Sequence, residues 1–134
     1  LGVVLFQLPP FLKKDAGLLQ DFVTTLPRGA RATFEFRHES WFDDEVLEIL
    51  RGRGLALCVA DSEKLSAPVE ITAPYAYFRL RDEGYTPADI ARWGDTIMRE
   101  AAGCADVFVY FKHEESGKGP AFATALLRAL GGPS

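Results

Sequence analysis

Apolar and polar positions along the chain follow two alternating patterns. Five short runs rich in Val, Phe, Tyr and Leu have the length and composition of buried parallel strands; they cover residues 3–8, 32–37, 55–61, 75–81 and 107–112. Between most of them, apolar residues recur at helical spacing, which is typical of amphipathic helices. This alternation predicts an α/β protein with a parallel sheet.

The helical stretches begin at residues that suit helix caps. These residues are Asp15, Ser40 with Asp43 in the manner of a capping box, and Thr86 with Pro87 and Asp89. A fourth apolar stripe covers residues 122–130 and predicts a last helix. Residues 62–74 have no helical period, so we expect a loop there.

Two architectures fit this order of elements. A doubly wound sheet of five strands would be complete at 134 residues, whereas a (β/α)8 barrel needs roughly 250. In most of the strands, one face is uniformly apolar or small and the other turns polar near the carboxyl end. A doubly wound sheet would bury Glu35, Arg37 and Arg79 under helices, but a barrel leaves them at a mouth near water. The predicted fold class is therefore α/β, a partial TIM (β/α)8 barrel of about five βα units with parallel strands.

Composition narrows the class of protein. With 48% hydrophobic and 25% charged residues, the chain is an ordinary globular sequence, and residues 1–134 are expected to form a single domain. Cys58 and Cys104 lie in apolar stretches without metal-ligand spacing, which suits a reducing compartment. No apolar run approaches roughly 20 residues and no signal peptide is recognisable. We expect a cytoplasmic protein with no membrane partner.

The net charge of −4 argues against a general nucleic-acid binder, but the predicted strand ends are locally basic. Four cations and two anions leave a net charge of +2 among these groups, which are Gln7, Glu35, Arg37, Asp61, Arg79, Arg81, Tyr110 and Lys112. Arginine matches phosphate or carboxylate oxygens in a bidentate manner, so this mouth suits a small anionic or phosphorylated ligand. The alternative is an internal ion-pair lattice that only compensates Glu35.

Three residues are candidates for catalysis. Glu35 is placed to act as a general base or metal ligand, His38 to exchange protons near neutral pH, and Asp61 to orient a group. Glu35 and Asp61 also resemble a glycosidase pair, but neighbouring arginines would keep both carboxylates ionised and disfavour a general acid. No ligand spacing supports a metal and no serine or cysteine lies in a nucleophile elbow, so neither metal nor cofactor is predicted.

Other candidates would contact the ligand rather than react. Trp41 is suited to stack on a base or sugar, although packing as a core anchor is the favoured explanation for this residue. Lys112 and His113 precede a loop with glycines, whose backbone N–H groups suit a phosphate. Trp41 and Tyr85 with the basic mouth also leave open a nucleic-acid-binding or scaffold protein, and a metal-assisted hydrolase or isomerase is a further alternative.

Several short motifs occur in order along the chain. They are FQLPP at 6–10, EFRH at 35–38, SW at 40–41, ADS at 60–62, YFRLR at 77–81 and YFKHE at 110–114. Together they resemble the YecE-like family, also called domain of unknown function 72. This resemblance implies a TIM-barrel fold and no particular reaction.

The position of these motifs adds an expectation about the barrel. In full-length members of that family, the strand with the FQLPP motif lies well inside the chain. The sequence thus resembles the last five strands of a barrel, with about three βα units upstream expected to be missing. Open sheet edges would then favour self-association.

Overall fold

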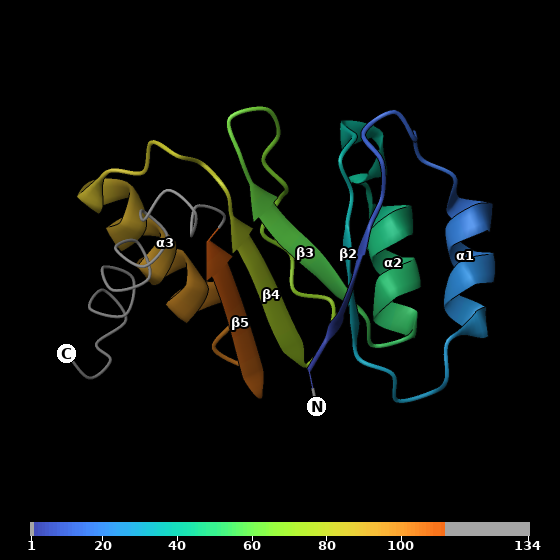
Figure 1. Ribbon diagram of the computed structural model, residues 1–134. Helices are drawn as coiled ribbons and strands as arrows, with labels where there is room; N and C mark the ends of the chain where they lie inside the picture. Colours follow the sequence, from blue (N-terminus) through green and yellow to red (C-terminus); the bar gives the residue numbers. More distant parts are fainter. Residues whose placement is uncertain (1, 112–134) are drawn as a thin grey trace.

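The computed structural model describes residues 2–111 and contains one parallel sheet of five strands in sequence order (Figure 1). The strands are β1 Val4–Gln7, β2 Ala32–Glu35, β3 Ala56–Asp61, β4 Tyr75–Leu80 and β5 Asp106–Phe111. Each of the first four predicted runs therefore contains a strand, and the fifth strand begins one residue earlier than the predicted run. The carboxyl ends of the strands share the upper edge of the sheet in Figure 1, and the connections there carry the candidate site.

The helices are α1 Ala16–Thr25, α2 Asp44–Gly52 and α3 Pro87–Glu100, with a short 3-10 helix η1 Glu39–Trp41 before α2. Asp15 caps α1 by accepting a hydrogen bond from the Leu18 N–H, and Thr86 and Asp89 form a capping box on α3. Both caps agree with the prediction.

The predicted capping box at Ser40 is wrong. Asp43 alone caps α2, and its carboxylate accepts from the Val46 N–H. The Ser40 hydroxyl instead accepts a hydrogen bond from the Lys14 N–H at 2.7 Å. The cap lies three residues later than expected because η1 takes up residues 39–41.

The three α-helices cover the same face of the sheet. Leu19 and Val23 of α1 and Val46 and Leu50 of α2 pack in one apolar cluster with the outward side chains of β2 and β3. A second cluster joins α3 to the outward side chains of β3, β4 and β5. Sequential parallel strands with helices on one face are the arrangement of a TIM barrel rather than of a doubly wound sheet. The described chain thus has the predicted fold class.

Strand β3 has only small side chains on the face turned away from the helices. The register pairs Thr33 with Ala56 and Ala60 with Arg79, so these residues and Cys58 share that inner face. The Tyr75 hydroxyl of β4 crosses β3, donates to the Ala32 carbonyl at 2.8 Å and accepts from the Ala32 N–H at 2.9 Å. This contact between next-nearest strands draws the sheet into a curve.

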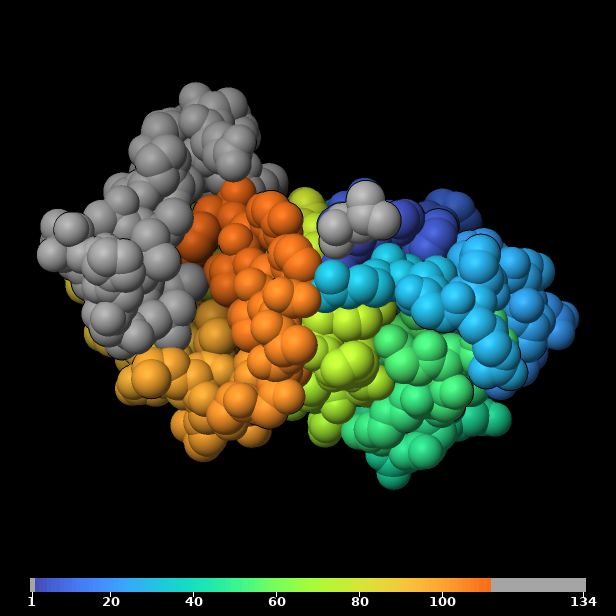
Figure 2. All heavy atoms as spheres, turned by 90° about the horizontal axis from the view of Figure 1, so that it is seen from below, coloured from blue at the N-terminus to red at the C-terminus, as the bar shows by residue number. Residues whose placement is uncertain are grey.

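A second long-range contact lies at the same edge of the sheet, where the strands begin. The Arg31 guanidinium donates to Asp106 at 2.8 Å and lies 4.7 Å from the centre of the Tyr75 ring. Seen from below, the turn before β2 lies against the start of β5, although two strands separate them in the sheet (Figure 2). The contact of Tyr75 with Ala32 and that of Arg31 with Asp106 therefore both require a curved inner face of the sheet.

Two expectations lie outside the described residues: the end of the fifth strand at Lys112 and the helix at 122–130. Within residues 2–111, the longest helix is α3, and none is long and apolar enough to cross a membrane.

Replacing Tyr75 with Phe removes a buried hydroxyl that bonds two backbone groups of β2. Because both groups lose a partner away from water, we expect Tyr75→Phe to lower the free energy of unfolding by about 1–3 kcal/mol. Urea denaturation measures the change. Tyr110→Phe is the matched control, since this half-exposed hydroxyl makes no hydrogen bond with residues 2–111. Equal stability of the two variants would contradict a role for Tyr75 in joining β4 to β2.

Candidate functional site

The carboxylate of Glu35 is the centre of a cluster at the carboxyl ends of β1, β2 and β4. Glu35 is 2% exposed, and its Oε1 accepts hydrogen bonds from Gln7 Nε2 at 3.1 Å and from Arg79. Its Oε2 lies 3.3 Å from an Arg81 nitrogen and 3.8 Å from Arg37 Nε. Three guanidinium groups around one carboxylate leave a local net charge of +2.

The local fold explains why these five side chains meet. Gln7 and Glu35 are register partners on β1 and β2 and so project from the same face of the sheet. Arg79 projects from that face on β4 and reaches β2 across the small Ala60 of β3. Of the basic mouth predicted from sequence, the structure brings these five side chains together.

A cavity of about 230 Å³ opens beside the cluster. Glu35, Arg37 and Arg81 line one part of it, and the remainder is lined by Pro10, Phe36, Ala60 and residues 62–65. Arg37 is one-third exposed, and within residues 2–111 its only polar partner is Glu35, at the long distance of 3.8 Å. Arg37 is therefore the cluster cation with the most donor capacity left for a ligand.

The β1–α1 loop, residues 8–15, forms one rim of the cavity and is fixed in place. The Trp41 indole N–H donates to the Leu12 carbonyl at 2.8 Å, and the Lys14 N–H donates to Ser40. The Lys14 ammonium forms an ion pair with Asp43 and another with Glu45 at 2.7 Å. The loop is thus anchored to η1 and to the start of α2.

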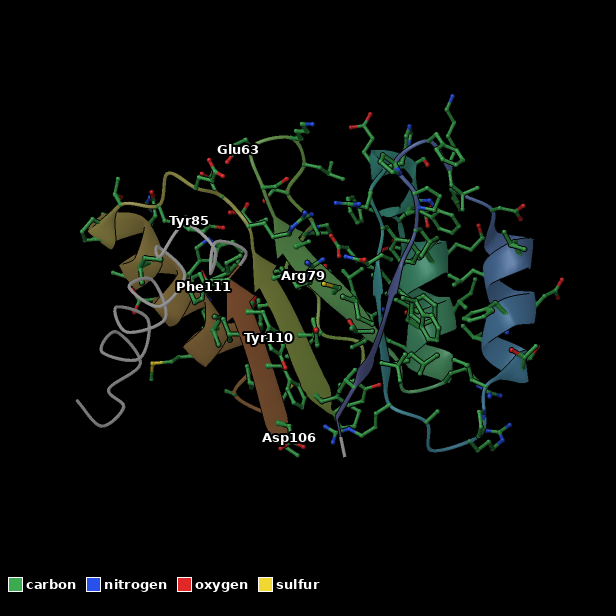
Figure 3. The ribbon with its side chains drawn as sticks, viewed as in Figure 1. Glu63, Arg79, Tyr85, Asp106, Tyr110 and Phe111 are labelled. Atoms are coloured by element: carbon green, nitrogen blue, oxygen red, sulfur yellow. The ribbon has the colours of Figure 1, made fainter. Side chains whose placement is uncertain are left out.

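The β3–β4 loop, residues 62–74, forms the other rim. The Ser62 hydroxyl accepts from two backbone N–H groups of the turn and donates to the Leu65 carbonyl at 3.1 Å. Glu63 accepts from the Glu83 N–H at 3.1 Å, which joins this loop to the one after β4. Figure 3 shows Glu63 in this loop above the level of Arg79. Lys64 and Glu63 both line the cavity, so this loop adds one cation and one anion to its rim.

Asp61 does not belong to this cluster, which corrects the prediction. In the register it pairs with Leu80, whose side chain packs under α3, so Asp61 faces outward. Its carboxylate accepts hydrogen bonds from Ser66 and, at 2.8 Å, from the Tyr85 hydroxyl. Burial and this bond raise the pKa of Tyr85 above its usual range. Asp61 and Glu35 therefore form no carboxylate pair.

Trp41 and His38 have structural positions in this conformation. Trp41 is 1% exposed, and its ring stacks on Phe36 with centroids 4.7 Å apart, so no face is available to a ligand. The His38 Nδ1 accepts from the Ser40 N–H at 3.1 Å and caps η1. Trp41 is thus a core anchor, and His38 shapes the turn that follows Arg37.

The remaining ligand-contact candidates lie on or after β5. Tyr110 is the register partner of Arg79 on the neighbouring strand (Figure 3). Its ring lies 5.2 Å from that of Tyr77. It is half exposed on the inner face of the sheet, away from the cavity. Lys112 and His113 lie outside the described residues.

The chemistry that this arrangement allows is recognition of negative charge. Burial, and next the charge of Glu35, raise the pKa of the Cys58 thiol well above its usual range, which disfavours a thiolate nucleophile. Within residues 2–111, no group of three His, Cys, Asp or Glu side chains has the geometry of a metal site. Glu35 is fully surrounded by donors, so its carboxylate serves first to order the arginines.

Sequence reasoning missed Pro10 and Lys64 as parts of the cavity. Both lie in loops, where no periodicity assigns a side chain to a face. The available signal is their distance from a strand end, since Pro10 follows the first strand and Lys64 the third strand by three residues each.

The model of the family described as "Protein of unknown function DUF72" matches residues 1–134. The chain belongs to the DUF72 family. No curated protein matches it.

Solved DUF72 structures support the same fold for this DUF72 chain. It is similar to a DUF72 protein from Enterococcus faecalis, with a TM-score of 0.82 and 16% identity over 98% of this chain and 59% of that one. It is also similar to a DUF72 protein from Thermotoga maritima, with a TM-score of 0.73 and 23% identity over 96% of this chain and 57% of that one. The chain thus spans about three-fifths of the length of these relatives.

Removing the charge of Glu35 leaves three arginines without compensation. We expect Glu35→Gln to lower the free energy of unfolding by about 2–3 kcal/mol, a value below that of a fully buried pair because the arginines are partly exposed to water. Glu39→Gln, at an exposed glutamate of η1, is the matched control in the same urea titration. If Glu35→Gln proved as stable as the parent, Glu35 would not organise this cluster.

The ion pair that anchors the β1–α1 loop predicts a pH dependence. The hydrogen bond from Lys14, followed by that from the Val46 N–H, lowers the pKa of Asp43 below its unfolded value. The stabilisation from the ionised Asp43 carboxylate is therefore present above about pH 4 and is lost as the pH falls through the lowered pKa of this group. We expect Asp43→Asn to melt below the parent at pH 7, with the difference closing towards pH 3.

Thermal melts at intervals between pH 7 and pH 3 test this expectation. Asp21→Asn, at an exposed aspartate of α1, is the control and should follow the parent throughout. A melting difference for Asp43→Asn that stays constant over this range would show that the ion pair contributes nothing.

Proposed function

We propose that this DUF72 chain binds a small anionic or phosphorylated ligand in the cavity at the carboxyl ends of its strands. The observation that carries the proposal is the local net charge of +2 around Glu35, in a chain whose total charge is −4. A positive cleft in an acidic protein focuses the electrostatic field at the place where an anion enters. The carboxyl ends of barrel strands are also where this fold generally carries its sites.

Arg37 is the proposed primary contact. Arg79 and Arg81 already contact Glu35, while the Arg37 guanidinium borders the cavity with unused donors. A planar guanidinium binds two phosphate or carboxylate oxygens at once, which a single ammonium does not. Lys64 on the opposite rim would add a second cation, and Glu35 would hold the set in place.

The ion pairs around Glu35 are compatible with an anion site at the same strand ends. A lattice that only neutralised Glu35 would need one cation, whereas three contact this carboxylate. The two cations in excess remain to be balanced by counter-ions or by a ligand. A catalytic role for Glu35 or His38, and a cytoplasmic location, remain predictions that the proposal does not require.

Titration of the full chain with inorganic phosphate and pyrophosphate tests the proposal by calorimetry and by thermal shift. We expect both ligands to raise the melting temperature, and Arg37→Gln to weaken binding by at least about tenfold. Binding should also weaken as salt is added, because the rim charges are screened.

Arg28→Gln is the control, since this exposed arginine lies in the turn before β2, at the opposite edge of the sheet. It should leave the affinity for phosphate unchanged. No binding to the folded parent chain, or equal losses in the two variants, would reject an anion site centred on Arg37.

A further inference from the structure

Phe11 is an exposed aromatic residue of the β1–α1 loop, directly after Pro10, which lines the cavity. Its side chain is 82% exposed, the largest value among the exposed large apolar residues of the described chain. The Leu12 N–H donates to the Pro9 carbonyl at 3.1 Å, so Pro10 and Phe11 lie at the tip of a tight turn. Figure 1 shows this β1–α1 loop at the upper edge of the sheet, where the β3–β4 loop also lies.

The turn that carries Phe11 is held firmly. Leu12, directly after Phe11, accepts the Trp41 indole N–H at 2.8 Å, and Lys14 is bonded to Ser40 and Asp43. The exposure of Phe11 is therefore a feature of an anchored turn and not of a loose end. Within residues 2–111, the Phe11 ring stacks on no other aromatic ring.

The size of the cavity limits what part of a ligand it encloses. Sites for whole drug-sized ligands are about 300–1,000 Å³, and this cavity is about 230 Å³. It has room for a phosphate and a group the size of a sugar. Any larger portion must extend past the rim, where Pro10 lines the cavity and Phe11 follows it in the chain.

We propose that the ligand is a nucleotide, with its phosphate at Arg37 and its base stacked on Phe11. This inference rests on the proposed anion site and adds the class of ligand. Stacking suits a nucleobase because every base has a flat π face, and an exposed ring at the end of an anchored turn is ordered before the ligand arrives. Phe11 would be a binding residue that contributes affinity without touching the phosphate.

The test compares three probes on the full chain: inorganic phosphate, ribose 5-phosphate and AMP. We expect AMP to bind about tenfold more tightly than ribose 5-phosphate. Phe11→Ala should lower the affinity for AMP to that for ribose 5-phosphate and leave the affinity for phosphate unchanged. Phe11→Trp should keep the preference for AMP, and its fluorescence should change when AMP binds.

Met98→Ala is the control, because this exposed apolar residue lies on α3. It should alter the affinity for none of the three probes. Since Phe11 is exposed, its variants should melt with the parent, which thermal denaturation checks.

The outcomes separate the two proposals. If no probe binds to the folded chain, the anion site itself is rejected. If phosphate binds but AMP is no tighter than ribose 5-phosphate, the site stands and the nucleotide inference is overturned. A preference for AMP that survives Phe11→Ala would likewise overturn the role of Phe11.

Discussion

Side chains of strand β4 contact strand β2 across the inner face of β3, and the curvature of the sheet depends on these contacts. Neighbouring strands lie about 4.8 Å apart, so two strands separated by a third are about 10 Å apart in a flat sheet. Tyr75 and Arg79 span this gap because β3 presents only small residues between them, namely Ala56, Cys58 and Ala60. Large side chains on β3 would fill the same space and hold β2 and β4 apart. Alternation of small and large inward residues is a general means of filling a barrel interior.

The contacts from β4 to β2 also explain how the fold accommodates the buried carboxylate of Glu35. A buried carboxylate is costly unless cations and donors surround it, and β2 supplies only Arg37 from its own end. Gln7 comes from the neighbouring strand, while Arg79 and Arg81 come from β4. Curvature thus brings compensation from both sides of β2, and it brings more positive charge than one carboxylate needs. The excess positive charge around Glu35 is a consequence of how β4 packs against β2 across the inner face.

The fold was largely predictable from sequence, whereas the site was predictable only in part. Period-two alternation assigns a side chain to a face within a strand, and it correctly grouped Glu35 with Arg37 and opposite Phe34. The same rule places Asp61 with Val59 on the outward face, and treating Asp61 as part of the mouth because of its polarity was the error. Loops have no such rule, so Lys64 was missed. Contacts that pass over one or two intervening strands, such as that of Arg31 with Asp106, depend on curvature that no local pattern expresses.

Charge and shape at the candidate site have separate structural origins. The charge comes from strand ends, where Glu35 orders the arginines. The shape comes from two loops fixed by hydrogen bonds that involve none of those groups, such as that from Trp41 to Leu12. A substitution in a loop can therefore change what fits in the cavity while the cations stay in place. Rigid strand ends with variable loops are what allow one barrel fold to serve many ligands. For the anion site proposed here, the strand ends would supply the positive charge and the two loops would set which anion fits.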